Sequence, residues 1–514
     1  MESKPYSTRR VLEILREKKG KGIRLPDLEL PKSKISVPAP VRIRLKDGEH
    51  DNPRTVCHSV YNYLQNSGLI IAPEKDIKLG KIKSYKLNDS GSEKIFYSEH
   101  SYNSYLLFTH LVSLMDKGSM IFFGPPGTGK TTAPELVTRF LYDIPVNKIQ
   151  EGVIYGNPEL TLTDMVATTH IGILLKTGDE VVMPREFMKS MIRIIDEVNR
   201  ITPGKLSILY QVADRGFTTY KGHKIIAPPG PLFATANAAD SGNYPMPVPF
   251  LDRFDVAVNS NFLNANYFGY FGSRKKGKTN NNLEYLVNIP PSLTAKDIVK
   301  IRKEINAVGF EPDALGQLVY FILDMNSCYQ ANRDSERKTK ASTSNKKPGA
   351  LCADCHYLSD KNICSCTKQG LSTRTYWSTY TFSKAFAWWL GKKEVSTDIV
   401  EAIIPYLVHH KIEPTNIALE KDPVYVNDRI SFVKDMFEIA SNQYDIVKQQ
   451  FPIDDLSRII ANIYSKQSGP GVKSEDIETM LADVKNIDSA VKFSIASALL
   501  DIKNRIENGS NYWI

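Results

Sequence analysis

The sequence predicts an α/β protein with a parallel sheet core, a helical region after it, a small α+β module before it and further helices at its end. Two observations predict the core. Between residues 99 and 262, short apolar segments alternate with helical patterns, as in a parallel sheet whose strands are joined by crossover helices. Each apolar segment is short enough for a buried strand. The expected strands are Ser119–Phe123, Gly152–Tyr155, Met191–Ile195, Gly230–Thr235 and Asp255–Val258.

Composition excludes several classes of protein. Of the 514 residues, 42% are hydrophobic and 24% are charged, which is ordinary for a globular chain and unlike a mainly disordered, collagen-like or coiled-coil protein. No run of eighteen apolar residues occurs, and no apolar segment follows the charged N-terminus, so we expect no membrane contact and a cytoplasmic location. The net charge of +9 permits nucleic-acid contact without requiring it.

Four regions are predicted along the chain. Residues 1–98 have two helical patterns, Arg9–Lys18 and Thr55–Leu69, followed by an alternating segment, Lys78–Leu87, that reads as a strand pair. This module is either a winged helix or a generic α+β cap. The regions that follow are an α/β core at 99–262, a helical lid at 263–414 with an insert at about 331–370, and a helical region at 415–514 that includes Ile430–Ala440 and Ala490–Ile506.

A phosphate-binding loop lies between the first predicted strand of the core and a helix at Ala133–Leu141. The segment Gly124–Thr131 fits the pattern GxxxxGK[ST] in the strand–loop–helix context that this motif requires. Its glycines let backbone N–H groups point at an anion, Lys130 places a positive charge on the β- and γ-phosphates, and the Thr131 hydroxyl is a Mg²⁺ ligand. The predicted ATP-binding residues are Gly124, Pro125, Pro126, Gly127, Thr128, Gly129, Lys130, Thr131 and Thr132.

Two adjacent carboxylates follow the predicted strand Met191–Ile195. Asp196 is expected beside the Mg²⁺ held by Thr131, and Glu197 is expected to polarise the water that attacks the γ-phosphate. A strand that ends in Asp-Glu usually just meets solvent, but the phosphate loop upstream favours the catalytic interpretation.

At this point the chain resembles the AAA+ ATPases, and among them the MoxR family. The resemblance rests on three sequence motifs that occur in the same order in MoxR proteins. They are Asp196-Glu-Val-Asn-Arg200, Phe233-Ala-Thr-Ala-Asn237, and Tyr244-Pro-Met-Pro followed by Leu251-Asp-Arg-Phe254. It implies a ring, a homo-hexamer, with ATP between subunits.

The same resemblance assigns three further catalytic roles. Asn237 would be the polar sensor residue that orients the attacking water. Arg253 would reach the neighbouring subunit's site as an arginine finger. Arg374, in Leu371-Ser-Thr-Arg374 of the lid, would contact the γ-phosphate. As plain structural residues, Asn237 would cap a turn and Arg253 would form an ion pair within its own subunit.

Two more segments fit this likeness. Asn157–Met188 is similar to the helix-2 insert of the group that also includes the MCM and McrB motors. Residues 217–226 alternate around Gly222, which is typical of a β-hairpin. In related rings this hairpin faces the pore, so Tyr220, Lys221 and Lys224 are candidates for gripping a polymer. The alternative is a surface hairpin with solvated lysines.

Four of the six cysteines fall within fifteen residues, at Cys352, Cys355, Cys364 and Cys366. Two close pairs joined by a polar connector suit one tetrahedral Zn²⁺, with His356 as an alternative ligand. The simple interpretation is a metal-stapled structural knob in the lid, and the other is a contact surface for nucleic acid or a partner, favoured by the basic segment Arg333–Lys347. Cys57 and Cys328 are expected to be ordinary buried thiols.

These observations predict a Mg²⁺-dependent ATP hydrolase that remodels a macromolecule. The resemblance implies a chaperone that assembles or activates a protein substrate, often beside a partner with a von Willebrand A domain. The alternative is a nucleic-acid motor resembling MCM or McrB, and a third hypothesis is a nucleotide-gated scaffold without turnover. The fold alone does not choose among them.

Overall fold

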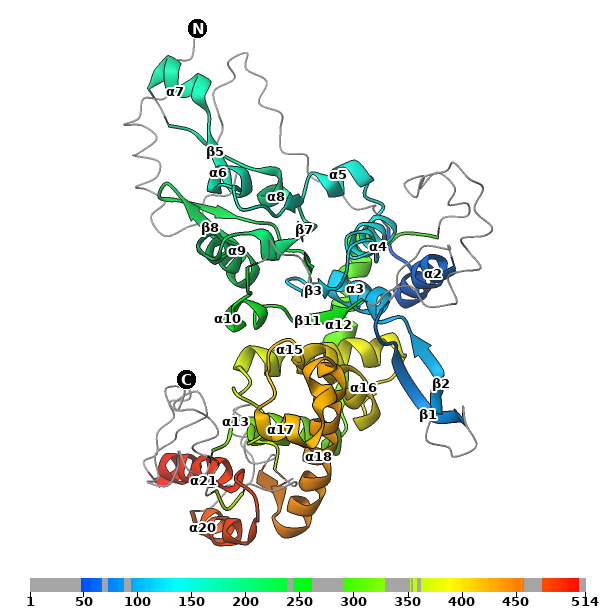
Figure 1. The fold of residues 1–514 in the computed structure, drawn as a ribbon, viewed down its shortest axis with the longest axis vertical. Coiled ribbons are helices and arrows are strands. Elements are labelled where there is room, and N and C mark those ends of the chain that lie inside the picture. The colour runs from blue at the N-terminus through cyan, green and yellow to red at the C-terminus, as the bar shows by residue number, and fades with distance from the viewer. Residues whose placement is uncertain are drawn as a thin grey trace. The chain divides into compact units, whose positions relative to one another are not determined.

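The parallel sheet is the element that positions the predicted site residues, and a computed structural model describes it (Figure 1). The structure describes residues 48–66, 73–86, 94–178, 180–237, 244–260, 290–328, 352, 355–357, 362–453, 455–456 and 474–507. The chain divides into two compact units, the first comprising residues up to 77 and 101–304 and the second residues 78–100 and 305–514. Over the described residues, no helix is both long and apolar enough to cross a membrane.

Five parallel strands form the sheet of the first unit, in the order β11-β3-β10-β7-β4. All five predicted strands are present, which confirms the predicted α/β core. Four pair along the registers Leu232↔Ser119, Leu232↔Arg193 and Val256↔Met120. Most side chains of these four strands are buried. The strands are β3 (Ser119–Phe123), β4 (Val153–Tyr155), β7 (Arg193–Asp196), β10 (Leu232–Ala236) and β11 (Val256–Asn259).

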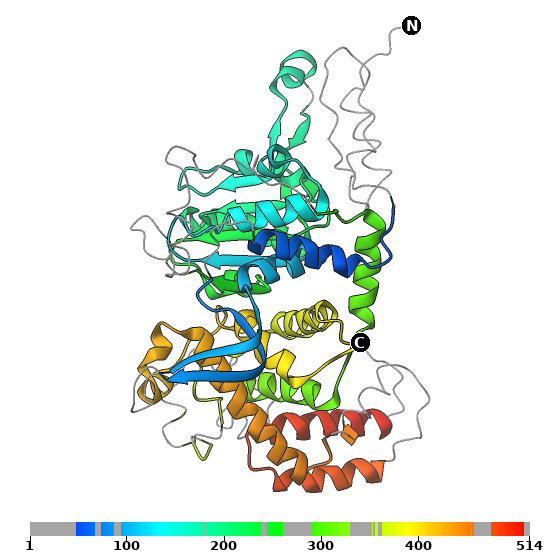
Figure 2. The ribbon, with the colours of Figure 1, turned by 90° about the vertical axis from the view of Figure 1, so that its right-hand side faces the viewer.

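Helices cover this sheet, and α2, the first helix that the structure describes, packs on them (Figure 2). Helix α2 packs against α3 and α4, where Tyr63 lies 5.3 Å from Phe140, ring centre to ring centre. The Tyr61 hydroxyl accepts a hydrogen bond of 2.8 Å from the Asn103 N–H at the start of α3. The helices of this unit include α2 (Pro53–Asn66), α3 (Ser104–Leu114), α4 (Thr132–Tyr142), α9 (Pro203–Arg215) and most of α12 (Ala295–Ala307).

The N-terminal expectations have mixed outcomes. The helix expected at Thr55–Leu69 is α2, whereas the one at Arg9–Lys18 lies outside the described residues. The segment Lys78–Leu87 is wrong as a strand pair, because it belongs to one strand, β1 (Ile77–Lys86), whose partner is the later β2 (Lys94–Tyr102). Local alternation cannot reveal a partner that comes later in the chain. The four-region division and the winged helix stay predictions.

Two antiparallel ribbons extend the first unit beside α9. Strands β5 (Ala167–Thr169) and β6 (Val182–Pro184) pair and carry α7 (Ile171–Thr177) at their end (Figure 1). We call residues 167–184 the finger. The predicted hairpin is present as β8 (Phe217–Tyr220) paired with β9 (His223–Ile226).

The second unit is mainly helical. Helices α13, α16 and α18 pack against one another, and α15 packs on α16. The Tyr320 hydroxyl of α13 donates a buried hydrogen bond of 2.9 Å to Ser489 Oγ, which connects α13 to the C-terminal helices. Its main helices are α13 (Pro312–Asn326), α15 (Thr373–Trp389), α16 (Thr397–Val408), α18 (Arg429–Gln450), α20 (Ser474–Asp483) and α21 (Lys492–Glu507).

Candidate active site

The phosphate loop has the backbone conformation that only its glycines adopt without strain. Gly124, Gly127 and Gly129 have φ angles of 142°, 79° and 81°, in the region that favours glycine. At Gly124 the constraint is also steric, because an added Cβ would lie 1.9 Å from Ser260 Oγ. The loop therefore tolerates no side chain at its first position.

Lys130 is buried at the end of this loop and points back across it. Its ammonium donates hydrogen bonds of 2.8 Å to the Gly124 carbonyl and 2.6 Å to the Pro125 carbonyl. Burial lowers the pKa of Lys130, and the nearby Asp196 and Glu197 oppose that shift. The charge that the motif predicts is thus placed inside the loop, next to the backbone that would receive phosphates.

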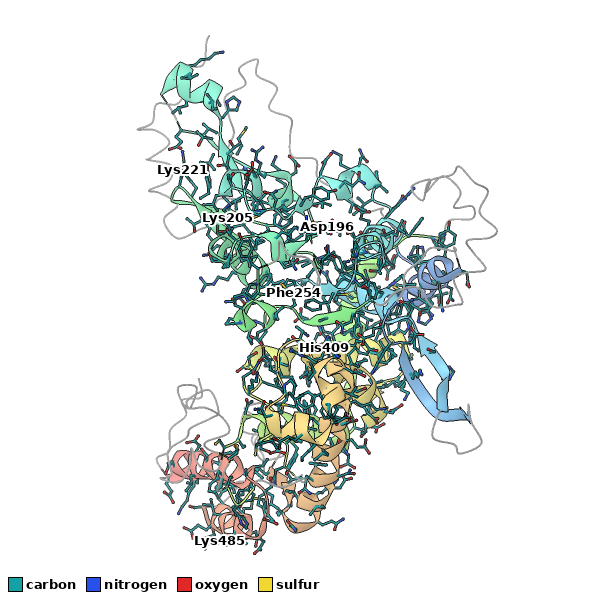
Figure 3. The ribbon with its side chains drawn as sticks, viewed as in Figure 1. Asp196, Lys205, Lys221, Phe254, His409 and Lys485 are labelled. Atoms are coloured by element: carbon teal, nitrogen blue, oxygen red, sulfur yellow. The ribbon has the colours of Figure 1, made fainter. Side chains whose placement is uncertain are left out.

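Asp196, labelled in Figure 3, connects the end of the phosphate loop to strand β10. One of its oxygens, Oδ1, accepts a hydrogen bond of 2.8 Å from Thr131 Oγ1, which follows β3, and one of 2.5 Å from Thr235 Oγ1 in β10. Hydroxyl and carboxylate oxygens are the ligands that Mg²⁺ prefers. Thr131 and Asp196 therefore fit the predicted metal, which would neutralise charge on the transferring phosphoryl group when bound.

Glu197 lies beside Asp196 in a left-handed conformation, with φ of 52°. Asn237 Nδ2 donates a hydrogen bond of 2.7 Å to Glu197 Oε1, and Arg200 forms an ion pair of 3.0 Å with Oε2. The Thr235 hydroxyl also accepts from the Glu197 N–H at 2.9 Å. A carboxylate bridged to an amide in this way can accept a proton from a water that the amide helps to orient.

The two predicted arginines lie in different units. Arg253 follows α10 (Val248–Leu251) in the first unit, is half-buried, and donates to the Pro249 carbonyl. Arg374 lies in the first turn of α15 in the second unit. Their roles at a neighbouring subunit and at the γ-phosphate stay predictions.

The candidate pore residues contact neighbours within the first unit. Lys221, at the hairpin turn, pairs with Glu180 of the finger and donates to Thr169 Oγ1 at 3.1 Å (Figure 3). Lys224 Nζ lies 4.0 Å from the ring centre of Phe217, and the Tyr220 hydroxyl is 3.4 Å from Thr163 Oγ1. The hairpin thus contacts the finger where its two strands meet α7, and a grip on a polymer stays a prediction.

The predicted zinc ligands do not form a metal site as they are arranged. Cys352 and Cys355 are half-exposed, while Cys364 and Cys366 are buried. Within the described part of the chain, no three His, Cys, Asp or Glu side chains are placed to hold a metal ion. Of the other two thiols, Cys57 is buried as expected, and burial raises its pKa, whereas Cys328 is only partly buried.

Three residues that the motifs did not single out complete the site. The Thr235 hydroxyl donates to the Asp196 carboxylate and accepts from the Glu197 backbone N–H, and Asn199 Nδ2 donates 2.8 Å to the Asn237 carbonyl. Strand alternation was a signal for Thr235, because it is two positions before Asn237 and so shares its face. No sequence pattern pointed to Glu135 in α4. Its burial, and to a smaller extent the negative charge of Asp196, raise the pKa of Glu135 to about 7.

Comparisons with known proteins agree with this geometry. Residues 119–254 match the AAA domain of the dynein-related subfamily, and residues 359–427 match the AAA lid domain. A crystal structure of a putative ATPase from Cytophaga hutchinsonii superposes with a TM-score of 0.50 at 16% identity, covering 74% of this chain and 94% of that one. That likeness shows the fold alone.

Two other comparisons carry no functional argument. A full-length MCM homolog from Methanopyrus kandleri has a TM-score of 0.36 at 11% identity, covering 72% of this chain and 64% of that one. No protein with a curated description matches the chain.

Replacing Glu197 with Gln tests the catalytic assignment. The substitution keeps a hydrogen-bond acceptor for Asn237 but removes the base, so we expect ATP turnover to fall by at least about 100-fold. Nucleotide affinity should stay within about threefold, because the phosphate loop is unchanged. Single-turnover hydrolysis and equilibrium nucleotide binding measure the two quantities, and turnover at the wild-type rate would refute the role of Glu197.

Proposed function

We propose that this chain, an AAA ATPase of the dynein-related subfamily with its own lid, assembles as a ring and uses ATP hydrolysis to remodel a protein partner. The ring would be a homo-hexamer in which Arg253 serves the neighbouring subunit's site and Arg374 the γ-phosphate. Its activity would be that of a MoxR-like chaperone.

One observation carries this proposal: a single segment runs from the catalytic carboxylates to the finger and back. It starts at Glu197, passes through α9 and the β8–β9 hairpin, and ends just after β10 at Asn237, whose side chain donates a hydrogen bond to Glu197. On the way, Lys205 of α9 donates 2.7 Å to the Pro158 carbonyl, and Lys221 pairs with Glu180 (Figure 3). A change at the γ-phosphate that moved Glu197 or Asn237 would therefore act on both ends of the segment that braces the finger.

The end of the finger favours a protein partner over nucleic acid. Helix α7 has no buried residue, and Ile171, Leu174 and Leu175 are 67%, 40% and 81% exposed. Their spacing of i, i+3 and i+4 places them on one helix face, as in helices that dock into apolar grooves. Residues 157–190 carry five acidic and three basic side chains, a net −2 that phosphates would not favour. Nucleic-acid motors remain the alternative function.

Steady-state ATP turnover with two kinds of polymer distinguishes the two functions. We expect a reduced and alkylated, permanently unfolded protein to stimulate turnover several-fold. The double variant Leu174→Ser plus Leu175→Ser should lose this stimulation and keep basal turnover, because it changes only the exposed end of the finger. Val424→Ser plus Val426→Ser is a matched control, since both valines are 56% exposed but lie in the second unit.

Two results would contradict a protein partner that binds at α7. Stimulation by single- or double-stranded DNA that fades steeply with salt would indicate phosphate contacts and favour the nucleic-acid motor. A finger variant that responds to unfolded protein as strongly as the wild type would show that α7 does not contact it.

Mixed rings test the role of Arg253. Arg253→Ala and Lys130→Ala should each be inactive alone, the first because a neighbour's site lacks its positive charge and the second because its own loop cannot bind phosphates. Mixing them should restore measurable turnover, since some interfaces then combine an intact Lys130 with an intact Arg253. No restoration over a range of mixing ratios would contradict an intersubunit role.

Elemental analysis of the purified chain tests zinc. The cysteine spacing predicts about one structural Zn²⁺ per chain, lost in Cys352→Ser plus Cys355→Ser, with the phosphate loop still able to bind nucleotide. A zinc content near zero would agree instead with the arrangement of the four thiols in the structure.

A further inference from the structure

Ser260 lies against the phosphate loop although it is far from it in the sequence. It directly follows β11, and its side chain is buried, with the residue 8% exposed. Its Oγ is 2.7 Å from the Oγ1 of Thr128, which is 132 positions away, and Thr128 is 4% exposed. No motif in the sequence includes Ser260.

Neighbouring carbonyls accept hydrogen bonds from both hydroxyls. The Phe123 carbonyl accepts one of 2.7 Å from the Ser260 backbone N–H and one of 3.1 Å from the Ser260 hydroxyl. Thr128 Oγ1 donates 2.9 Å to the Pro125 carbonyl. Each hydroxyl has one proton, so either Ser260 donates to Thr128 and Thr128 to the Pro125 carbonyl, or Thr128 donates to Ser260 and Ser260 to the Phe123 carbonyl. Both arrangements keep the 2.7 Å contact between the two hydroxyls.

Contacts at both ends of β11 fix the position of Ser260. Glu74 N–H donates 2.8 Å to the Asn259 carbonyl, and Pro73 forms a bridge to Ser260. At the other end of the strand, Asp255 Oδ2 accepts from the N–H and the hydroxyl of Ser119, at 3.0 and 2.9 Å. The hydroxyl therefore projects from a fixed strand end toward a loop that is built largely of glycine and proline.

We propose that Ser260 is a positioning residue that holds the phosphate loop in its nucleotide-binding conformation through Thr128. Fixing Thr128 orients the backbone N–H groups around it before the phosphates arrive, so less conformational freedom is lost on binding. Ser260 has no contact with Asp196 or Glu197 among the hydrogen bonds described. Its removal should therefore weaken nucleotide binding and leave the chemical step nearly unchanged.

Ser260→Ala tests this directly. We expect the Kd for ADP and the KM for ATP to rise about three- to tenfold, as for the loss of one buried hydrogen bond, while kcat stays within about twofold. Ser119→Ala is the matched control, because it removes a buried serine hydroxyl at the start of the neighbouring strand β3, where that hydroxyl bonds to Asp255 at the opposite end of β11. It should lower the unfolding temperature as much as Ser260→Ala does, yet leave the Kd for ADP within twofold.

A double-mutant cycle separates positioning from general destabilisation. Thr128→Val removes the same contact from the loop side and nearly conserves side-chain volume. If Ser260 acts through Thr128, adding Ser260→Ala to Thr128→Val raises the Kd less than twofold further. Independent effects would multiply instead. The proposal is overturned if they multiply, if Ser260→Ala binds ADP as the wild type does, or if kcat falls while KM is unchanged.

These measurements are independent of the remodelling function. They need only nucleotide binding and basal turnover of the full chain, so they can succeed even if no polymer partner is found, and they can fail while the remodelling proposal stands.

Discussion

The shared hydrogen bonds of Asp196 are the constraint on which the active site depends. One carboxylate oxygen accepts from Thr131 and from Thr235, which belong to segments 65 and 39 residues away in the sequence. A parallel sheet makes this possible, because the carboxyl ends of β3, β7 and β10 lie at one edge.

The same sheet edge explains how catalysis can be connected to a surface at a distance. Glu197 and Asn237 hold the two ends of one continuous segment, and the hairpin in that segment contacts the finger through Lys221. Contacts of this kind transmit force only if both ends are fixed, and here each end is a strand of the central sheet. In the function we propose, the exposed aliphatic side chains of α7 are the ones that contact the partner.

Much of the site was predictable because its residues fall within a few short strings, although these strings are far apart in the sequence. Gly124–Thr131, Asp196 with Glu197, and Asn237 each occupy a short string whose chemistry is recognisable without a structure. The hairpin at 217–226 was predictable for a similar reason, since antiparallel partners joined by a tight turn share one local pattern. The strand pair expected within Lys78–Leu87 failed because its partner, β2, comes later in the chain.

By itself, the sequence determined the nucleotide chemistry, the five strands and the type of fold, since local periodicity and motif spacing encode these. Only the tertiary structure decided that Lys221 contacts the finger, that no three of the described cysteines are placed to hold a metal ion, and that Ser260 lies against Thr128. Each of these depends on distances between residues that are remote in sequence or on the path of an intervening loop. Such distances follow from packing and strand order, which no short pattern records.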